Sequence, residues 1–109
     1  MSPTQRAIKD LKELGFTAQV VERWNSYARV HQDLFGCIDI IACKQGVGIL
    51  GIQVTSGTNH AARRSKAEDE PRIKEWMLSG GRMEIWSYSK RGGRGERKRW
   101  ELRREELFL

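Results

Sequence analysis

The chain has 109 residues, which is enough for one domain with a single hydrophobic core and too few for two. Apolar residues make up 39% of the chain and charged residues 31%, the balance of a globular protein with a highly charged surface. The net charge of +6 favours polyanionic partners, of which nucleic acid is the commonest. A basic protein without such a ligand has the same composition, so charge alone does not decide between the two.

The sequence shows no sign of a membrane or a secretory route. No apolar run approaches the roughly 20 residues of a membrane-spanning helix, and residues 1–11 are too polar for a secretory signal. Cys37 and Cys43 lie too far apart along one predicted strand to bond to each other, and no zinc-binding spacing is present. We therefore expect a cytoplasmic (intracellular) protein with two buried thiols and no membrane partner.

The first half of the chain predicts a helix followed by strands. Ser2 or Thr4 can cap a helix that has Pro3 in its first turn, an apolar stripe along one side, and Gly15 at its end. Residues 16–24 are expected to form one strand, and residues 25–31 a loop or strand extension. In that segment Tyr27, Arg29 and His31 are candidates for phosphate or base contacts.

The second half of the chain begins with two apolar strands within residues 33–55, joined by a tight turn over 44–48. A helix is expected over 61–67 and another from Pro71, with Ile73, Trp76, Met77 and Leu78 as its buried side. Alternation predicts a strand over 83–89, followed by a Gly-rich basic turn over 90–99 and a last hairpin strand.

Three polar residues interrupt the apolar hairpin: Asp39 in its first strand and Gln53 and Thr55 in its second. A buried carboxylate is costly unless it is paired, hydrogen-bonded, near solvent or bound to a cation. The period of two puts Gln53 and Thr55 on one face, and antiparallel pairing can bring Asp39 beside Gln53 there. Such converging oxygen atoms suit a hard cation such as Mg²⁺.

Asp33 precedes Asp39 by six residues, and it has two interpretations of equal weight. The segment between them, Leu34-Phe35-Gly36, can bend the chain so that both carboxylates approach one cation. Alternatively, the Asp33 side chain caps the turn at Gly36 through an Asx-type hydrogen bond.

The pattern G-x-x-D-I-I-A, a turn and then G-I-Q-V-T resembles the core of the PD-(D/E)XK nuclease superfamily, and most closely its Holliday-junction resolvase type. The family has an Asp at the end of one strand and a Glu-x-Lys on the next. Asp39 matches the Asp, whereas Gln53 and Thr55 stand where the Glu and the Lys would be. The resemblance covers most of the chain.

The resemblance implies an α/β fold: one domain over residues 1–109 with a mixed sheet of four to five strands flanked by helices, in a restriction-endonuclease-like αβββαβ core. It also implies a metal-dependent DNA endonuclease that hydrolyses phosphodiesters, those of branched DNA included. Asp39, Gln53 and Asp33 would bind Mg²⁺ or Mn²⁺. A symmetric homodimer is implied as well.

Two features of the family need substitutes in this chain. Thr55 cannot supply the charge of the missing lysine, so Lys66 is the first candidate and Lys44 the second. The family also has a Glu on the first helix, at a position that falls near Thr4 and Gln5, and Asp10 is a better substitute than Glu13.

The DNA contacts are expected from basic residues on three segments, although each could be only a solvated surface. These residues are Arg29 before the hairpin, His60, Arg63 and Arg64 beside Lys66, and Lys90, Arg91 and Arg94 in the Gly-rich turn. Two alternatives to the nuclease stay open. The chain could be a non-catalytic nucleic-acid-binding module derived from the nuclease fold, or a structural subunit of a larger assembly.

Overall fold

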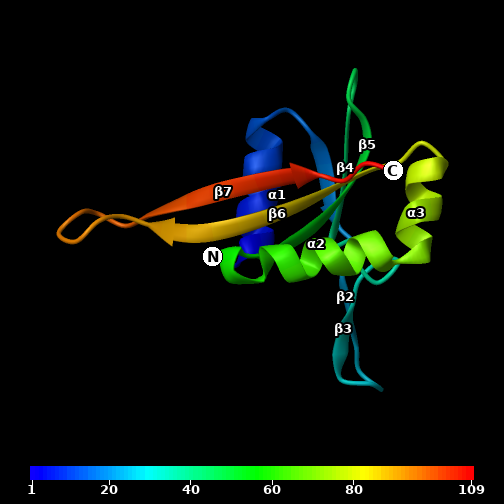
Figure 1. The fold of residues 1–109 in the computed structure, drawn as a ribbon, viewed down its shortest axis with the longest axis horizontal. Coiled ribbons are helices and arrows are strands. Elements are labelled where there is room, and N and C mark those ends of the chain that lie inside the picture. Colours follow the sequence, from blue (N-terminus) through cyan, green and yellow to red (C-terminus); the bar gives the residue numbers. More distant parts are fainter.

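The computed structural model describes all residues, 1–109, and has three α-helices packed on a five-stranded mixed sheet (Figure 1). The helices are α1 (Pro3–Glu13), α2 (His60–Asp69) and α3 (Pro71–Leu78), with a short 3₁₀ turn, η1 (Gly57–Asn59), before α2. The strands are β1 (Thr17–Val20), β2 (Arg23–Asn25), β3 (Val30–Gln32), β4 (Ile40–Lys44), β5 (Gly48–Ser56), β6 (Arg82–Arg91) and β7 (Arg99–Glu106).

The strand order in the sheet is β1-β4-β5-β6-β7, while β2 and β3 form a separate two-stranded sheet. Only β5 and β6 pair in parallel, because α2 and α3 connect them; the other neighbours are antiparallel. This arrangement confirms the expected α/β fold with a mixed sheet flanked by helices.

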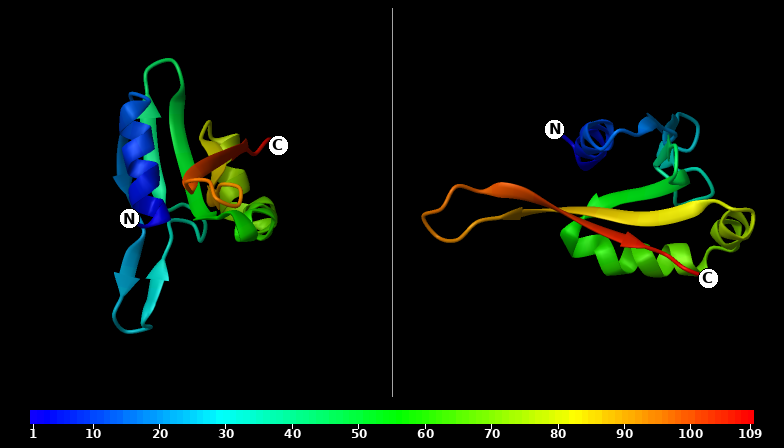
Figure 2. Two further views of the ribbon diagram at one scale, coloured as in Figure 1. Left: turned by 90° about the vertical axis from the view of Figure 1, so that its left-hand side faces the viewer. Right: turned by 90° about the horizontal axis from the view of Figure 1, so that it is seen from above.

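The helices cover both faces of the sheet (Figure 2, right). On one face α1 contributes Ala7 and Leu11 to a core that includes Ile40, Ile52 and Trp86. The opposite face is covered by α2 and α3 through Ala67 and Ile73, which contact a second buried cluster around Met83 and Ile85. The first core also includes Leu50, Ile52 and Val54 of β5, so it fixes the strand that carries Gln53 and Thr55.

The predicted start of α1 is confirmed by a capping box. The Ser2 hydroxyl accepts a hydrogen bond from the Gln5 amide at 3.2 Å, and the Gln5 side chain accepts one from the Ser2 amide at 2.9 Å. At the other end the chain leaves the helix through Gly15 with a φ of +88°, a conformation that favours glycine.

The predicted hairpin of residues 33–55 is confirmed as β4 and β5, with Ile40 opposite Ile52. Three smaller predictions were wrong. Leu78 is 60% exposed, so it does not belong to the buried side of α3. Cys43 is also exposed and only Cys37 is buried, although both are free thiols as expected.

The third wrong prediction was a single strand over 16–24, which divides into β1 and β2. The chain breaks between them because the amides of Val21 and Glu22 both donate to the carbonyl oxygen of Asp39, at 2.8 and 3.3 Å. Beyond this point β2 pairs with β3, so the expected loop is largely a hairpin, and it projects from the body of the domain (Figures 1 and 2).

The strands β6 and β7 form a long arm that carries the Gly-rich turn away from the helices (Figure 1). Their pairing runs from Glu84 with Glu106 to Arg91 with Arg99, so the predicted strand over 83–89 is longer than expected. No helix in the structure has both the length and the apolar character required to cross a membrane.

Candidate metal centre

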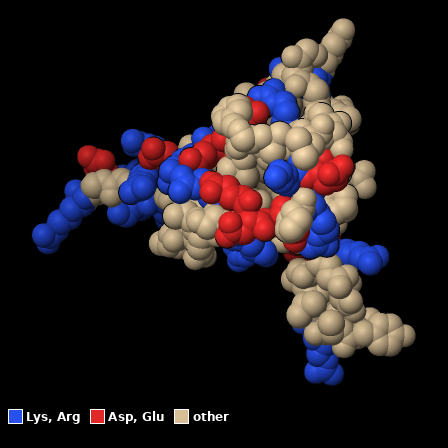
Figure 3. Space-filling model, turned by 45° about the vertical axis from the view of Figure 1, so that its right-hand side comes forward, with Lys and Arg blue, Asp and Glu red and all other residues tan.

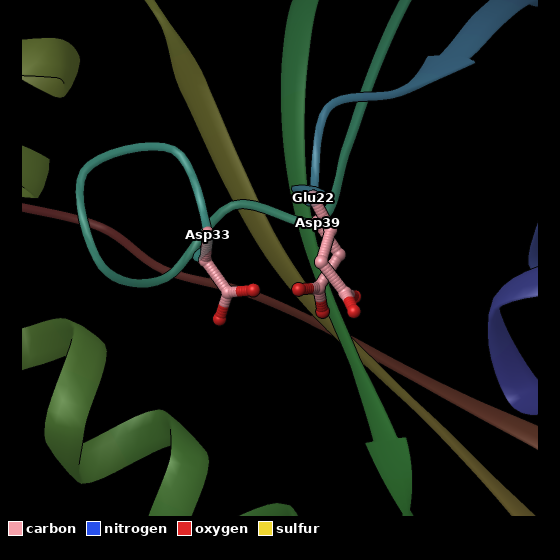
Figure 4. A group of neighbouring side chains, drawn as sticks. All are labelled: Glu22, Asp33 and Asp39. Carbon is pink, nitrogen blue, oxygen red and sulfur yellow. The ribbon is translucent and has the colours of Figure 1, made fainter. Parts of the chain in front are cut away.

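Three carboxylates meet at the base of the projecting hairpin: Glu22, Asp33 and Asp39 (Figure 4). One ligand oxygen from each lies within 4.8 Å of those of the other two. The three residues come from the segments that follow β1, follow β3 and precede β4, so the junction of the hairpin with the main sheet assembles the cluster. Asp39 is only 4% exposed, whereas Glu22 and Asp33 are half-buried.

Asp39 is held in place by the neighbouring strand. Its Oδ2 accepts hydrogen bonds from the Val54 amide at 2.8 Å and from the Gln53 Nε2 at 2.9 Å. The prediction that Asp39 lies beside Gln53 is therefore confirmed. No lysine, arginine or histidine lies within salt-bridge distance of Asp39, so its negative charge has no cationic partner in the protein.

Burial raises the pKa of Asp39 to about 8, and a hydrogen bond with Asp33 and the charges of Asp33 and Glu22 act in the same direction. The Val54 amide opposes them by favouring the charged form. The carboxylate therefore keeps a proton near neutral pH unless a cation binds it. A divalent ion in contact with the three side chains would reverse this balance, since it favours the ionised form.

Asp33 reaches the cluster because of the turn that follows it. The amide of Gly36 donates to the main-chain oxygen of Asp33 at 3.2 Å, and Leu34 and Ile38 pair across the turn. Phe35 and Gly36 have φ of +54° and +75°, a conformation that is strained for a bulky residue such as Phe35. The alternative prediction, that the Asp33 side chain caps this turn, was wrong. The Gly36 amide bonds to the main-chain oxygen of Asp33, and the side chain of Asp33 faces Asp39.

Gln53 supplies a second kind of oxygen atom to this centre. The residue is 3% exposed, its Nε2 is bonded to Asp39, and its buried Oε1 has no hydrogen-bond partner. A buried carbonyl oxygen without a partner is costly, and a hard cation would satisfy it. Because Nε2 is the end that faces Asp39, a half-turn of the amide is required to present Oε1 to the carboxylates, and it gives up the hydrogen bond to Asp39. The residues present therefore fit Mg²⁺ or Mn²⁺.

Glu22 is the member of the cluster that sequence reasoning missed, since it had been assigned to an uninterrupted strand. The only signal was an acidic residue directly after the apolar Val20-Val21. The expected substitute for the third carboxylate, Asp10, was wrong: it accepts a hydrogen bond from the Tyr88 hydroxyl at 2.7 Å and lies outside the cluster.

The positions expected to replace the family lysine differ in their surroundings. Thr55 is buried two residues beyond Gln53. The Lys44 ammonium donates to the main-chain oxygen of Leu14 at 2.7 Å, and Lys44 lies five positions from Asp39, about 17 Å along an extended strand. Lys44 is therefore excluded as the substitute. Lys66 is exposed and lines a groove that contains Asp33.

This groove has a volume of about 520 Å³, and Asp33 is the member of the acidic cluster that lines it. Its polar lining comes from the hairpin base and from the helices: Arg23, His31, Gln32, Asp33, Lys66 and Arg72. Arg72 is paired with Glu70 at 2.6 Å, whereas Arg23 and Lys66 have no carboxylate partner. The groove therefore contains two basic side chains that make no salt bridge.

The prediction that His60 contacts DNA was wrong, because the residue is only 1% exposed. His60 Nδ1 lies 2.6 Å from Ser87 Oγ, and its Nε2 lies 2.8 Å from Glu105 Oε1. The hydrogen bond to His60 also lowers the pKa of Glu105. These bonds attach the start of α2 to β6 and β7, so His60 has a structural role.

Substituting His60 with alanine is expected to lower the free energy of unfolding by about 2–4 kcal/mol, because it leaves a cavity and an unpaired Ser87 hydroxyl. Chemical denaturation measures this change. The matched control is His31→Ala, whose side chain is 63% exposed and which should lose at most about 1 kcal/mol. Equal losses in the two variants would contradict the structural role of His60.

The other residues expected to bind DNA are spread over three surfaces. Arg29 is exposed in the turn of the projecting hairpin, and Arg63 is half-buried without an ion-pair partner. Arg64 is paired with Glu105 and Glu68, at 3.2 and 3.3 Å, so its charge is largely compensated. Lys90, Arg91 and Arg94 lie on the arm.

Lys and Arg side chains gather along this arm, at the left of Figure 3. Six of residues 90–99 are basic and only Glu96 is acidic. Lys90 lies five positions along β6 from Ile85, the partner of Gln53, a separation of about 17 Å. The arm is therefore too far away to take part in chemistry at the cluster.

Comparisons of this chain with protein-family models, with characterised proteins and with solved structures find no match.

Proposed function

We propose that the protein is a metal-dependent endonuclease that hydrolyses phosphodiesters in DNA. One observation supports this most strongly: Asp33, one of the three carboxylates of the acidic cluster, also lines a groove that contains Arg23 and Lys66. Carboxylates alone would fit a cation, and basic side chains alone would fit a polyanion. A phosphodiester bound together with a divalent cation would use both kinds of side chain.

Glu22, Asp33 and Asp39 would hold Mg²⁺ or Mn²⁺, with the Gln53 amide oxygen as a neutral ligand. Such an ion, when bound, polarises a phosphoryl oxygen and lowers the pKa of a water molecule. Arg23 and Lys66 would bind the phosphate and offset the charge that develops on it. Asp33, which is less buried than Asp39 and lines the groove, is the ligand nearest to a phosphate bound there.

The proposal also assigns roles to residues away from the cluster. Lys90, Arg91 and Arg94 on the arm, with Arg29 and Arg63, would attract the DNA backbone over a wider surface. A homodimer that cuts two strands stays a prediction. We place the enzyme in the cytoplasm, where DNA is accessible and where the free thiols of Cys37 and Cys43 stay reduced.

Cleavage assays with purified protein test the proposal. We expect single-stranded, duplex, flapped or four-way DNA to be cut in the presence of Mn²⁺ or Mg²⁺, and the same reactions to stop with EDTA. Each cut should leave a phosphate group on one product end and a hydroxyl group on the other. A pure, folded preparation that is inert on all four substrates with either ion would contradict the proposal.

A non-catalytic nucleic-acid-binding module is the second candidate, and the neutral residues Gln53 and Thr55 favour it. An amide attracts a divalent ion less than a carboxylate does, and a buried hydroxyl carries no positive charge for the transition state. Such a module would bind DNA in a salt-sensitive manner that EDTA does not change, through Arg63 and the arm. Binding that is lost on chelation would argue against it.

A further inference from the structure

The β2–β3 hairpin projects from the body of the domain (Figures 1 and 2), and none of residues 23–32 belongs to either core cluster. Tyr27 in its turn is 101% exposed and Trp24 is 55% exposed. Residues 23–32 contain two arginines, Arg23 and Arg29, and no acidic residue. Neither ring belongs to a core cluster, and both are accessible to a ligand.

The hairpin has a specific local structure. The Asn25 side chain accepts hydrogen bonds from the amides of Tyr27 and Ala28, at 3.0 and 3.1 Å. Trp24 and His31 pair across the two strands, with ring centroids 5.2 Å apart in an edge-to-face arrangement. A two-stranded hairpin alone is marginally stable in water, and these contacts keep its turn in one shape. Tyr27 is thereby held at the outermost point.

The hairpin is also connected directly to the candidate metal centre. His31 Nδ1 lies 2.8 Å from an oxygen of Glu22, which belongs to the acidic cluster. Arg23 and His31 line the same groove as Asp33. A nucleic-acid strand whose phosphate lies in this groove would therefore continue onto the base of the hairpin.

We propose that the β2–β3 hairpin stacks on unpaired bases, so that the protein selects DNA in which a duplex meets a single strand. Aromatic rings bind the exposed faces of unpaired bases, whereas a continuous duplex hides those faces within its base stack. The positive charge without any acidic residue fits a nucleic acid better than a protein partner. This inference specifies the substrate of the proposed nuclease and so rests on that function.

Substituting Tyr27 tests the inference without disturbing the fold, because this side chain is fully exposed. Binding is measured in EDTA against two DNA molecules of equal length: a blunt duplex, and a duplex with a single-stranded flap that contains 2-aminopurine. Tyr27→Ala should bind the flapped DNA about tenfold more weakly and no longer quench its fluorescence. Binding of the blunt duplex should change less than twofold.

Two further variants complete the comparison. Tyr27→Phe keeps the ring and should restore both the binding and the quenching, while Tyr27→Leu keeps apolar bulk and should not. The matched control is Phe108→Ala, which removes an aromatic ring that is 81% exposed near the C-terminus and should have no effect.

The inference is overturned if Tyr27→Ala weakens both DNA molecules equally or neither of them, since the hairpin would then contact backbone or a different partner. Cleavage assays of the same proteins with Mn²⁺ separate this failure from that of the nuclease. Cleavage with an unchanged substrate preference in Tyr27→Ala would support the nuclease and contradict the hairpin's role. If Tyr27→Ala loses flap binding and neither protein cleaves DNA, the result would support the hairpin's role and contradict the nuclease.

Discussion

Asp39→Asn is expected to abolish DNA cleavage and, at the same time, to stabilise the metal-free protein near pH 8. The carboxylate is 4% exposed and faces Asp33 and Glu22, so it provides the central ligand of the proposed cation. An amide preserves the shape of the side chain and removes its charge. We expect the cleavage rate to fall at least about 100-fold.

The gain in stability follows from the raised pKa of Asp39. This carboxyl has a pKa of 3.8 in an unfolded chain and about 8 in the folded protein. Between these values the folded state binds more protons than the unfolded state, so the free energy of unfolding decreases as pH rises. The contribution is fully present below pH 3.8 and is lost by about pH 8. Asparagine does not titrate, and the variant should be about 1–3 kcal/mol more stable than wild type at pH 8 in EDTA.

Denaturant unfolding at pH 5 and pH 8, with EDTA or Mn²⁺, measures these changes. Saturating Mn²⁺ should stabilise the wild type by about 2.7 kcal/mol at 100 times the dissociation constant and leave Asp39→Asn unchanged. The matched control is Asp69→Asn, an exposed acid at the end of α2 that should behave as wild type in every measurement. An Asp39→Asn protein that still cuts DNA, or that Mn²⁺ still stabilises, would contradict the proposed centre.

Gln53→Glu is expected to have opposite effects with and without metal. A carboxylate at this buried position would add a negative charge beside Asp39 Oδ2, where the amide nitrogen now donates a hydrogen bond at 2.9 Å. In EDTA at pH 8 this should lower the free energy of unfolding by about 2–4 kcal/mol, because two buried carboxylates would face each other. With metal, the extra charge should raise Mn²⁺ affinity about tenfold or more.

Calorimetric titration with Mn²⁺ and denaturant unfolding in EDTA provide the two measurements. The control is Gln45→Glu, which adds the same charge in the exposed turn between β4 and β5 and should change neither quantity. A Gln53→Glu protein that is destabilised both with and without Mn²⁺, with no gain in affinity, would show that the pocket does not accept a cation.

The amino-acid sequence alone determined the local elements and one contact of the site. Ser2 and Gly15 marked the ends of α1, and alternation over residues 33–55 predicted the hairpin and the proximity of Asp39 to Gln53. These predictions succeeded because capping and strand pairing depend on residues that are close in the chain or connected by a short turn. Asp33 could be proposed for the same reason, since it is six residues from Asp39.

Only the tertiary structure decided the rest of the site. Glu22 joins the cluster because β1 ends where the amides of Val21 and Glu22 donate to the carbonyl oxygen of Asp39. The pattern of apolar residues over 16–24 does not predict this end. His60 is buried because Ser87 and Glu105, residues from distant strands, surround it. Asp10 is bonded to Tyr88 for the same reason. Contacts between distant segments depend on how the helices and strands pack into the two cores. The pattern of neighbouring residues does not predict that packing.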